Sequence, residues 1–306
     1  MFFKKSVLFV DYFEDWIKKY KEGTVREVTL LKYKNSLLRL REIVPNLKMN
    51  KLDRATYQGI LNVYAEKHER QTTMDFHHHL KAAISDAIDD GLLKSDPTKR
   101  VIIKGTNHRV KKNKFMSLKD FQLLLNDLDL GGEINYDWLI YFIAKTGVRF
   151  SEALGVTPND FNFKKGIVSI NKTWNYKLGG GFEDTKTYSS KREIILDSKT
   201  NQEFKKLCKG LKEDRPIFLI SDKIYNSTVN DILGRHCNKL GIEEITIHGL
   251  RHTSGSLLFY SGCSLATISK RLGHSDMSIT QKVYLHIIDE LRDKDNRLIN
   301  KALSSL

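Results

Sequence analysis

Long apolar runs are absent from this chain of 306 residues. The longest, Trp138–Ala144, has seven residues, whereas a helix that spans a bilayer needs about 20. The apolar stretch near the N-terminus, Val7–Val10, stops at Asp11 and is shorter than the roughly 7–15 residues of a secretory signal core. We therefore expect no membrane segment and a cytoplasmic location.

Cysteine is scarce as well. Cys208, Cys237 and Cys263 lie far apart and form no CxxC pair, so they predict neither a disulfide framework nor a zinc site. Carboxylates with the spacing of a two-metal nuclease are also missing. We interpret the cysteines as reduced packing residues and expect a chemistry without metal ion or other cofactor.

Positive charge is what the chain has in excess. It contains 51 Lys and Arg against 37 Asp and Glu, a formal net charge of +14, which makes a polyanion the expected partner. Nucleic acid is the first choice and an anionic membrane surface the second. Residues 1–113 hold 23 basic and 14 acidic residues, and residues 114–306 hold 28 and 23, so the shorter first part is the more basic one.

A basic stretch divides the chain into two domains. Residues 105–114 are almost free of large apolar side chains, and Ser117 then offers an N-cap for an apolar-periodic helix that starts at Leu118. We predict a domain over residues 1–104, a linker over 105–114 and a second domain over 115–306. The 40% of apolar residues can fill both cores.

The first domain is predicted to be helical throughout. Apolar side chains recur at helical spacing in four segments, which begin near Val10, at a Thr29 cap, near Asp53 and near Thr73. Basic polar faces of such helices suit a DNA clamp, and the alternative is an ordinary bundle with a solvated basic face. His77, His78 and His79 point in different directions on the fourth helix, so we expect a solvated or DNA-facing surface there and no metal site.

The second domain mixes helices with a small β region. Ile167–Ile170 and Arg192–Leu196 have the pattern of strands and flank Gly179–Gly181 in a polar hairpin. Lys186 follows these glycines without the spacing GxxxxGK[ST] of a phosphate loop. A hairpin is therefore predicted here, and nucleotide binding is not.

Five residues of this domain stand where a phosphate could be held. Arg149 lies in the turn before a helix that we expect Ser151 to cap, and helix N-termini favour anions. His248 and Arg251 share one helix face at i, i+3 spacing. His274 follows Gly273, which ends the helix Leu265–Leu272, and Tyr284 comes ten residues later.

Taken in order, the segments TGVRFSE, TKT, HGLRHT, LGHSD and YLH resemble the motifs of the tyrosine recombinases, the phage integrase family, and the likeness spans essentially the whole chain. The resemblance implies a mainly α fold with a small β-sheet, in which a SAM-like four-helix core-binding domain precedes an α+β catalytic domain. It implies that the catalytic residues are Arg149, Lys186, His248, Arg251, His274 and Tyr284. Glu152 and His286 match supporting positions.

The chemistry of this set suits DNA cleavage. A tyrosine with a pKa of about 10 needs a proton acceptor at pH 7, for which His248 is the candidate. Arg149, Arg251 and His274 can stabilise charge on the phosphate oxygens, and Lys186 can protonate the departing 5′-oxygen. The product is a 3′-phosphotyrosine, whose bond energy makes ATP unnecessary.

We therefore expect a site-specific recombinase that integrates or excises a mobile element of phage or conjugative origin. The implied partners are double-stranded recombination sites, a tetramer of this chain on two duplexes, and an accessory excision factor. A tail helix from about residue 287 docks either on its own domain or on a neighbouring protomer. The alternatives are DNA relaxation of the type IB topoisomerase kind and a catalytically silent DNA-binding protein.

Members of the family often carry a further N-terminal domain that binds arm-type sites. The predicted core-binding helices begin almost at Met1. Either the protein lacks that domain or the chain begins after it.

Overall fold

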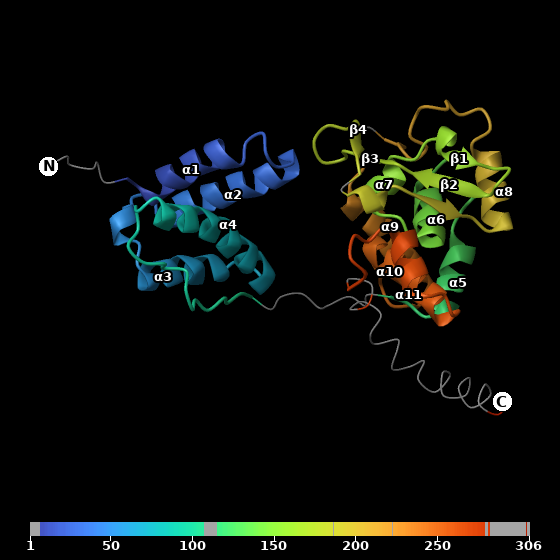
Figure 1. Cartoon of the computed structure of the whole chain (residues 1–306). Helices are drawn as coiled ribbons and strands as arrows, with labels where there is room; N and C mark the ends of the chain where they lie inside the picture. The colour runs from blue at the N-terminus through green and yellow to red at the C-terminus, as the bar shows by residue number, and fades with distance from the viewer. Residues whose placement is uncertain are drawn as a thin grey trace. The chain divides into compact units, whose positions relative to one another are not determined.

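The computed structural model describes residues 7–106, 115–185, 187–221 and 223–278, together with the single residues 281 and 304. The chain divides into two compact units, residues 1–110 and 111–306 (Figure 1). Most of the predicted linker lies outside the described residues, so the domain boundaries stay a prediction. Among the helices that the structure describes, none is long and apolar enough to cross a membrane.

The described part of the first unit, residues 7–106, contains four α-helices and one short 3-10 helix. Figure 1 shows α1 and α2 lying side by side. The third α-helix begins next to Asp53, as predicted, and Asp53 caps it by accepting a hydrogen bond from the Thr56 amide. The second begins before the predicted Thr29 and the fourth before the predicted Thr73. The elements are α1 (Phe9–Tyr20), α2 (Glu27–Ile43), η1 (Met49–Lys51), α3 (Arg54–Ala65) and α4 (Arg70–Asp89).

Aromatic side chains fill the core of the first unit. Phe9 and Phe13 of α1 and Phe76 of α4 are all but fully buried, and each such side chain contributes about 1.5–3 kcal/mol to folding. The indole Nε1 of Trp16 also donates a hydrogen bond of 2.6 Å to Asp86. These contacts tie the first helix to the last.

The three histidines of α4 differ from the expectation of a solvated or DNA-facing surface. The buried His77 ring lies with Nδ1 2.9 Å from the Tyr57 hydroxyl, and His79 Nδ1 lies 2.8 Å from the Ser36 hydroxyl. His78 alone among the three is exposed. The reason is that α4 packs against both α2 and α3, so successive positions, about 100° apart on a helix, meet different neighbours.

The second unit surrounds a small sheet with helices. Its helices are α5 (Leu118–Asp127), α6 (Tyr136–Thr146), α7 (Phe150–Leu154), α8 (Ser198–Leu207), α9 (Asn226–Leu240), α10 (Ile247–Tyr260) and α11 (Leu265–Leu272), with short 3-10 helices at Pro158–Asp160 and Tyr188–Ser190. Its strands are β1 (Phe161–Asn162), β2 (Ile167–Ile170), β3 (Lys172–Trp174), β4 (Phe182–Asp184) and β5 (Arg192–Ile195). The predicted N-cap at Ser117 is confirmed by its bond to the Asp120 amide.

The strands form two antiparallel sheets. One has the order β1-β2-β5, and the other is the hairpin β3-β4 around Gly179–Gly181. Both strands predicted from the sequence are present, although β5 ends one residue early. The buried helix α6, which Figure 1 shows behind the sheet, packs against α10. Cys208, Cys237 and Cys263 are free thiols.

The pleat of β5 turns a charged side chain toward the core. Ile194 faces Val168 across the sheet and Arg192 faces Ile170, and all four side chains are buried. Because alternate residues of a strand point to opposite faces, Glu193 and Ile195 lie on the outer face. A buried arginine therefore enters the unit beside the predicted catalytic residues.

Candidate active site

Arg149 stands at the junction of α6 and α7. Gly147 ends α6 in the left-handed conformation at φ 69°, and Arg149 occupies the N-cap of α7. Its amide donates to Glu152 Oε2 at 2.9 Å and its Nη1 donates to Oε1 at 2.6 Å. The expectation that Ser151 caps this helix was wrong, because the N-cap is Arg149, two positions earlier, and Glu152 accepts the hydrogen bond of its amide.

Glu152 joins two arginines. Its side chain is 1% exposed, and Oε2 also accepts a hydrogen bond of 2.9 Å from Nη2 of the buried Arg192. Burial by itself would raise the pKa of this carboxyl, but Arg192, followed by Arg149, outweighs burial and lowers the pKa below its ordinary value. Glu152 is therefore ionised at neutral pH.

The end of α11 collects three guanidinium groups on three consecutive carbonyl oxygens. Arg192 Nε donates to Arg271 O at 2.5 Å, Arg251 Nη2 to Leu272 O at 2.7 Å and Arg149 Nη2 to Gly273 O at 2.8 Å. The last carbonyls of a helix lack partners within it and carry partial negative charge. The C-terminus of α11 thus holds arginines from three separate elements in one place.

Arg251 also ties α11 to α6. Its side chain is 2% exposed, and Nη1 donates to Gly147 O at 2.6 Å. These bonds use two of the five N–H donors of a guanidinium. Arg251 thereby holds the ends of two helices beside Arg149.

Two histidines complete this arrangement. Burial, followed by Arg251 and Arg149, lowers the pKa of His274 to about 4. The same causes lower the pKa of His248, although the residue as a whole is exposed. Both rings are therefore neutral near pH 7, and a neutral imidazole has one donor and one acceptor nitrogen.

Five of the eight predicted site residues are thus brought together: Arg149, Glu152, His248, Arg251 and His274. Lys186, Tyr284 and His286 lie outside the described residues. The catalytic and supporting roles of all eight stay predictions.

A chain of hydroxyl groups begins at Thr187, the residue after Lys186 in the sequence. Thr187 Oγ1 is 2.9 Å from the buried Ser190 Oγ, and Ser190 Oγ accepts a bond of 3.4 Å from Arg149 Nη1. The segment that follows Lys186 is therefore in hydrogen-bond contact with the arginine cluster.

Arg192 and Ser190 are the residues that reasoning from the sequence missed. A signal for Arg192 was present, since it occupies a core-facing position of a strand whose other inward residues are apolar. Charged side chains are rarely buried unless they are paired. Such a position predicts a buried ion pair, although the sequence alone does not name the acidic partner.

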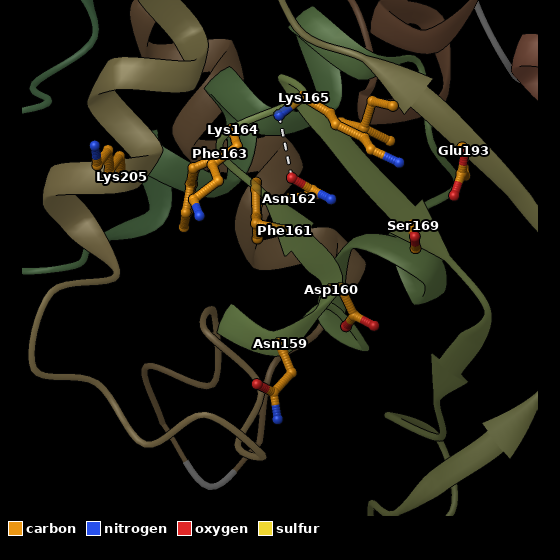
Figure 2. A pocket seen from close by; sticks show the side chains of 11 residues that line it. Asn159, Asp160, Phe161, Asn162, Phe163, Lys164, Lys165, Ser169, Glu193 and Lys205 are labelled. Atoms are coloured by element: carbon orange, nitrogen blue, oxygen red, sulfur yellow. Dashed lines mark hydrogen bonds between the residues drawn. The ribbon is translucent and has the colours of Figure 1, made fainter.

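An open pocket of about 650 Å³ lies on the other face of the sheet (Figure 2). Lys164, Lys165 and Lys205 line it with Glu193, the strand neighbour of Arg192. The dashed line in Figure 2 marks the bond from the Lys165 amide to Asn162. Adjacent strand residues face opposite ways, so this pocket is separate from the arginine cluster.

The described part of the chain offers no cluster of side chains typical of a metal site. These residues contain no group of three His, Cys, Asp or Glu side chains that could hold a metal ion.

Comparison with protein families identifies the chain. Residues 114–290 match the model of the phage integrase family, and residues 8–104 match the phage integrase SAM-like domain. The chain belongs to the phage integrase family. The family and the fold class predicted from the sequence are confirmed. The arginine cluster formed by Arg149, Arg192 and Arg251 therefore belongs to the integrase domain.

Known integrases resemble the chain over nearly its full length. The integrase of Staphylococcus phage L54a is 27% identical over 331 aligned positions, which cover 96% of this chain and 93% of the relative. A structure of the Tn1549 transposon integrase with a circular intermediate DNA has a TM-score of 0.79 at 19% identity and covers 96% of this chain and 100% of that one. A lambda integrase tetramer bound to a Holliday junction has a TM-score of 0.68 at 15% identity, with 92% and 78% covered.

Members of this family are tyrosine recombinases, which cleave and rejoin DNA through a tyrosine nucleophile. The chain is accordingly a site-specific recombinase, as the sequence predicted.

Proposed function

We propose that this recombinase cuts DNA with Tyr284 and holds the scissile phosphate with Arg149 and Arg251 at the end of α11, in order to integrate or excise a mobile element. The observation that carries the proposal is the convergence of Arg149 and Arg251 on the Leu272 and Gly273 carbonyls. His274 follows directly, and Tyr284 comes ten residues later in the chain.

The cluster supplies positive charge where the reaction creates negative charge. In-line attack on a phosphodiester places charge on the non-bridging oxygens. Arg149 and Arg251 place their positive charges beside such oxygens, and neutral His274 can add one N–H donor. A preorganised donor of this kind is worth about 2.7–4 kcal/mol in the transition state.

Proton transfer needs one base and one acid. The phenol of Tyr284, with an ordinary pKa of about 10, is ionised to roughly one part in a thousand at pH 7. His248, kept neutral by its surroundings, takes the phenolic proton as the oxygen–phosphorus bond forms. Lys186 donates a proton to the 5′-oxygen as the phosphorus–oxygen bond breaks. A 5′-hydroxyl of another strand then reverses these steps.

The partners follow from this chemistry. The substrate is a pair of double-stranded recombination sites, on which four copies of the chain assemble, as lambda integrase does on a Holliday junction. The tail from about residue 287 binds a neighbouring protomer, and an accessory excision factor sets the direction of the reaction. The protein acts in the cytoplasm, where the element's DNA is found.

The test is covalent capture. The protein is incubated in EDTA with a nicked suicide duplex that carries its site, and denaturing gels reveal a protein–DNA adduct. We expect an adduct from the wild type and none from Tyr284→Phe. Tyr260→Phe, which alters an exposed tyrosine at the opposite end of α10 from His248, is the matched control and should retain it. Absence of a wild-type adduct, or an undiminished one from Tyr284→Phe, would refute the mechanism.

Two further arms of the same experiment separate the alternatives. A topoisomerase relaxes supercoiled plasmid without pairing two duplexes, whereas a recombinase joins two sites into a synaptic complex. A chain that ends at residue 289 should still form the adduct but fail to hold two duplexes together on a native gel. Unchanged synapsis by that shorter chain would contradict the trans role of the tail.

A further inference from the structure

Arg192 binds three separate elements of the second unit. Nη2 donates to Glu152 of α7 at 2.9 Å, Nη1 donates to the Ser190 carbonyl at 2.8 Å, and Nε donates to the Arg271 carbonyl of α11 at 2.5 Å. All three guanidinium nitrogens are therefore engaged. The residue that makes these bonds is 9% exposed.

A buried guanidinium is costly to keep. Taking a charge out of water costs several kcal/mol, and a well-packed apolar residue in its place is often neutral or stabilising. An apolar side chain makes no directed hydrogen bonds, whereas the planar guanidinium of arginine holds its hydrogen-bond partners at fixed angles. The geometry of Arg192 therefore fits a requirement for position better than a requirement for stability.

The groups that accept hydrogen bonds from Arg192 also hold candidate catalytic residues in place. Glu152 holds Arg149 through both the amide and Nη1, and the Arg271 carbonyl belongs to the last turn of α11, directly before Gly273 and His274. The Arg192 guanidinium is thus linked to Arg149 through the Glu152 carboxylate and to His274 through the end of α11.

Gly273 provides an independent observation. A Cβ atom at this position would lie 2.8 Å from Nη1 of Arg192, and the backbone has φ +68°. Space at the end of α11 is therefore reserved for the arginine as well as for the left-handed turn.

We propose that Arg192 is a positioning residue for DNA cleavage, which orients Arg149 through Glu152 and fixes His274 through the end of α11. This inference rests on the proposed function of the cluster. It concerns a residue that touches neither DNA nor the reacting atoms.

The test compares cleavage, binding and folding in the full chain. Arg192→Gln keeps a polar side chain but loses the fork, and Arg192→Lys keeps the charge. Arg271→Gln is the matched control, because Arg271 also anchors α11, through bonds of 3.0 Å to the Ile195 and Lys145 carbonyls. The readouts are the single-turnover rate of adduct formation at saturating DNA, the Kd for the duplex and the Tm.

Misplacement by about 1 Å can cost about 100-fold in rate. We expect Arg192→Gln to slow adduct formation by about 100-fold while the Kd changes less than about two-fold, with Arg192→Lys in between. Arg271→Gln should lower the Tm about as much as Arg192→Gln does, but it should slow cleavage by less than about three-fold.

A pH profile distinguishes positioning from simple loss of folding. The charged groups that face Glu152 are Arg192 and Arg149, and His274 nearby is neutral. Removing Arg192 raises the pKa of Glu152 and also that of His274, which Arg192 helps to lower, so the acid limb of the cleavage rate should move to higher pH. In a Glu152→Gln background only the smaller part of this shift that comes from His274 should remain, and Arg192→Gln should cost less rate than it does in the wild type, since residues that act through one contact are not additive.

The outcomes separate the inference from the function on which it rests. A rate for Arg192→Gln within three-fold of the wild type, an unmoved acid limb, or full additivity with Glu152→Gln would each overturn the role of Arg192. If the wild type forms an adduct that Tyr284→Phe abolishes, the proposed function stands in that case. Absence of any wild-type adduct overturns both.

Discussion

At the scale of single residues, protonation in this protein is controlled by what each ring or carboxyl touches. Arg192 and Arg149 keep the buried Glu152 ionised, and Arg251 and Arg149 help to keep His248 and His274 neutral. The same physics acts in the first unit, where burial lowers the pKa of His77 to about 4. A neutral buried histidine couples the stability of its surroundings to pH.

His77 yields a prediction for the first unit. Unfolded His77 takes up a proton below pH 6.5, whereas the folded ring resists it to about pH 4, so stability is complete above pH 6.5 and falls as the pH drops toward 4. The loss amounts to at most about 3 kcal/mol. Hydrogen exchange of α3 and α4 peptides at pH 7.5 and 5 should show it.

Matched glutamine variants check the assignment to this ring. His77→Gln, which removes the buried ring, should reduce the pH dependence, of which a part remains because burial also lowers the pKa of His79. His78→Gln, on the exposed neighbouring position, should leave it as in the wild type. An equal response of both variants would show that His77 is not the titrating group.

At the scale of elements, the C-terminal end of α11 organises the site. Three consecutive carbonyls accept bonds from β5, α10 and the start of α7, so one helix end joins segments that are distant in the chain. Gly273 gives this end its left-handed turn. Residue 273 must therefore adopt the left-handed backbone conformation and must also leave space for the Arg192 side chain.

A comparison of Gly273 with Gly241 separates the requirement for a left-handed backbone from the requirement for space. Gly273 and Gly241 both end helices with φ near +67° (68° and 66°), but a Cβ at Gly241 meets nothing within 4 Å among the described atoms. Gly241→Ala should therefore cost only the backbone term of about 1–2 kcal/mol. Gly273→Ala should cost more, because the new methyl group displaces Arg192, and it should also slow adduct formation.

The measurement is urea denaturation of both variants beside the suicide-duplex assay. Equal losses of stability, with cleavage intact in Gly273→Ala, would contradict the spatial role of Gly273.

At the scale of the whole molecule, the net charge of +14 is distributed over distinct tasks. Part of it is buried in the arginine cluster, where it orders the site. The remainder is available to phosphates along a duplex, and it is concentrated in residues 1–113. Salt should therefore weaken DNA binding steeply, because each neutralised phosphate releases counterions.

Two lysine pairs test this distribution. Lys111→Gln with Lys112→Gln, in the predicted basic linker, should reduce the slope of log K against log salt by up to about 1.8, at about 0.9 for each phosphate that a lysine no longer neutralises. Lys164→Gln with Lys165→Gln, on the exposed turn beside the pocket of Figure 2, should change it little. Fluorescence anisotropy between 50 and 200 mM salt measures both, and equal slopes for the two pairs would contradict the assignment.

Much of the fold was predictable because its signals are local. Asp53 and Ser117 cap helices through amides three residues ahead, and Gly273 ends α11 at the predicted position. Errors arose where contacts override the expected local pattern: Arg149, bound by Glu152, takes the N-cap position expected of Ser151. Likewise α4 buries His77 and half-buries His79 because helices lie on two of its sides.

The sequence by itself determined the order of the helices and strands, the residue types available for phosphate chemistry and the family to which the chain belongs. These follow from spacings within about ten residues and from motifs read in order. The tertiary structure alone decided that Glu152 meets Arg192, 40 positions away, and that Arg149 meets the Gly273 carbonyl, 124 positions away. The physical reason is that buried charges must find partners wherever folding brings them, and no local pattern encodes which partners those are.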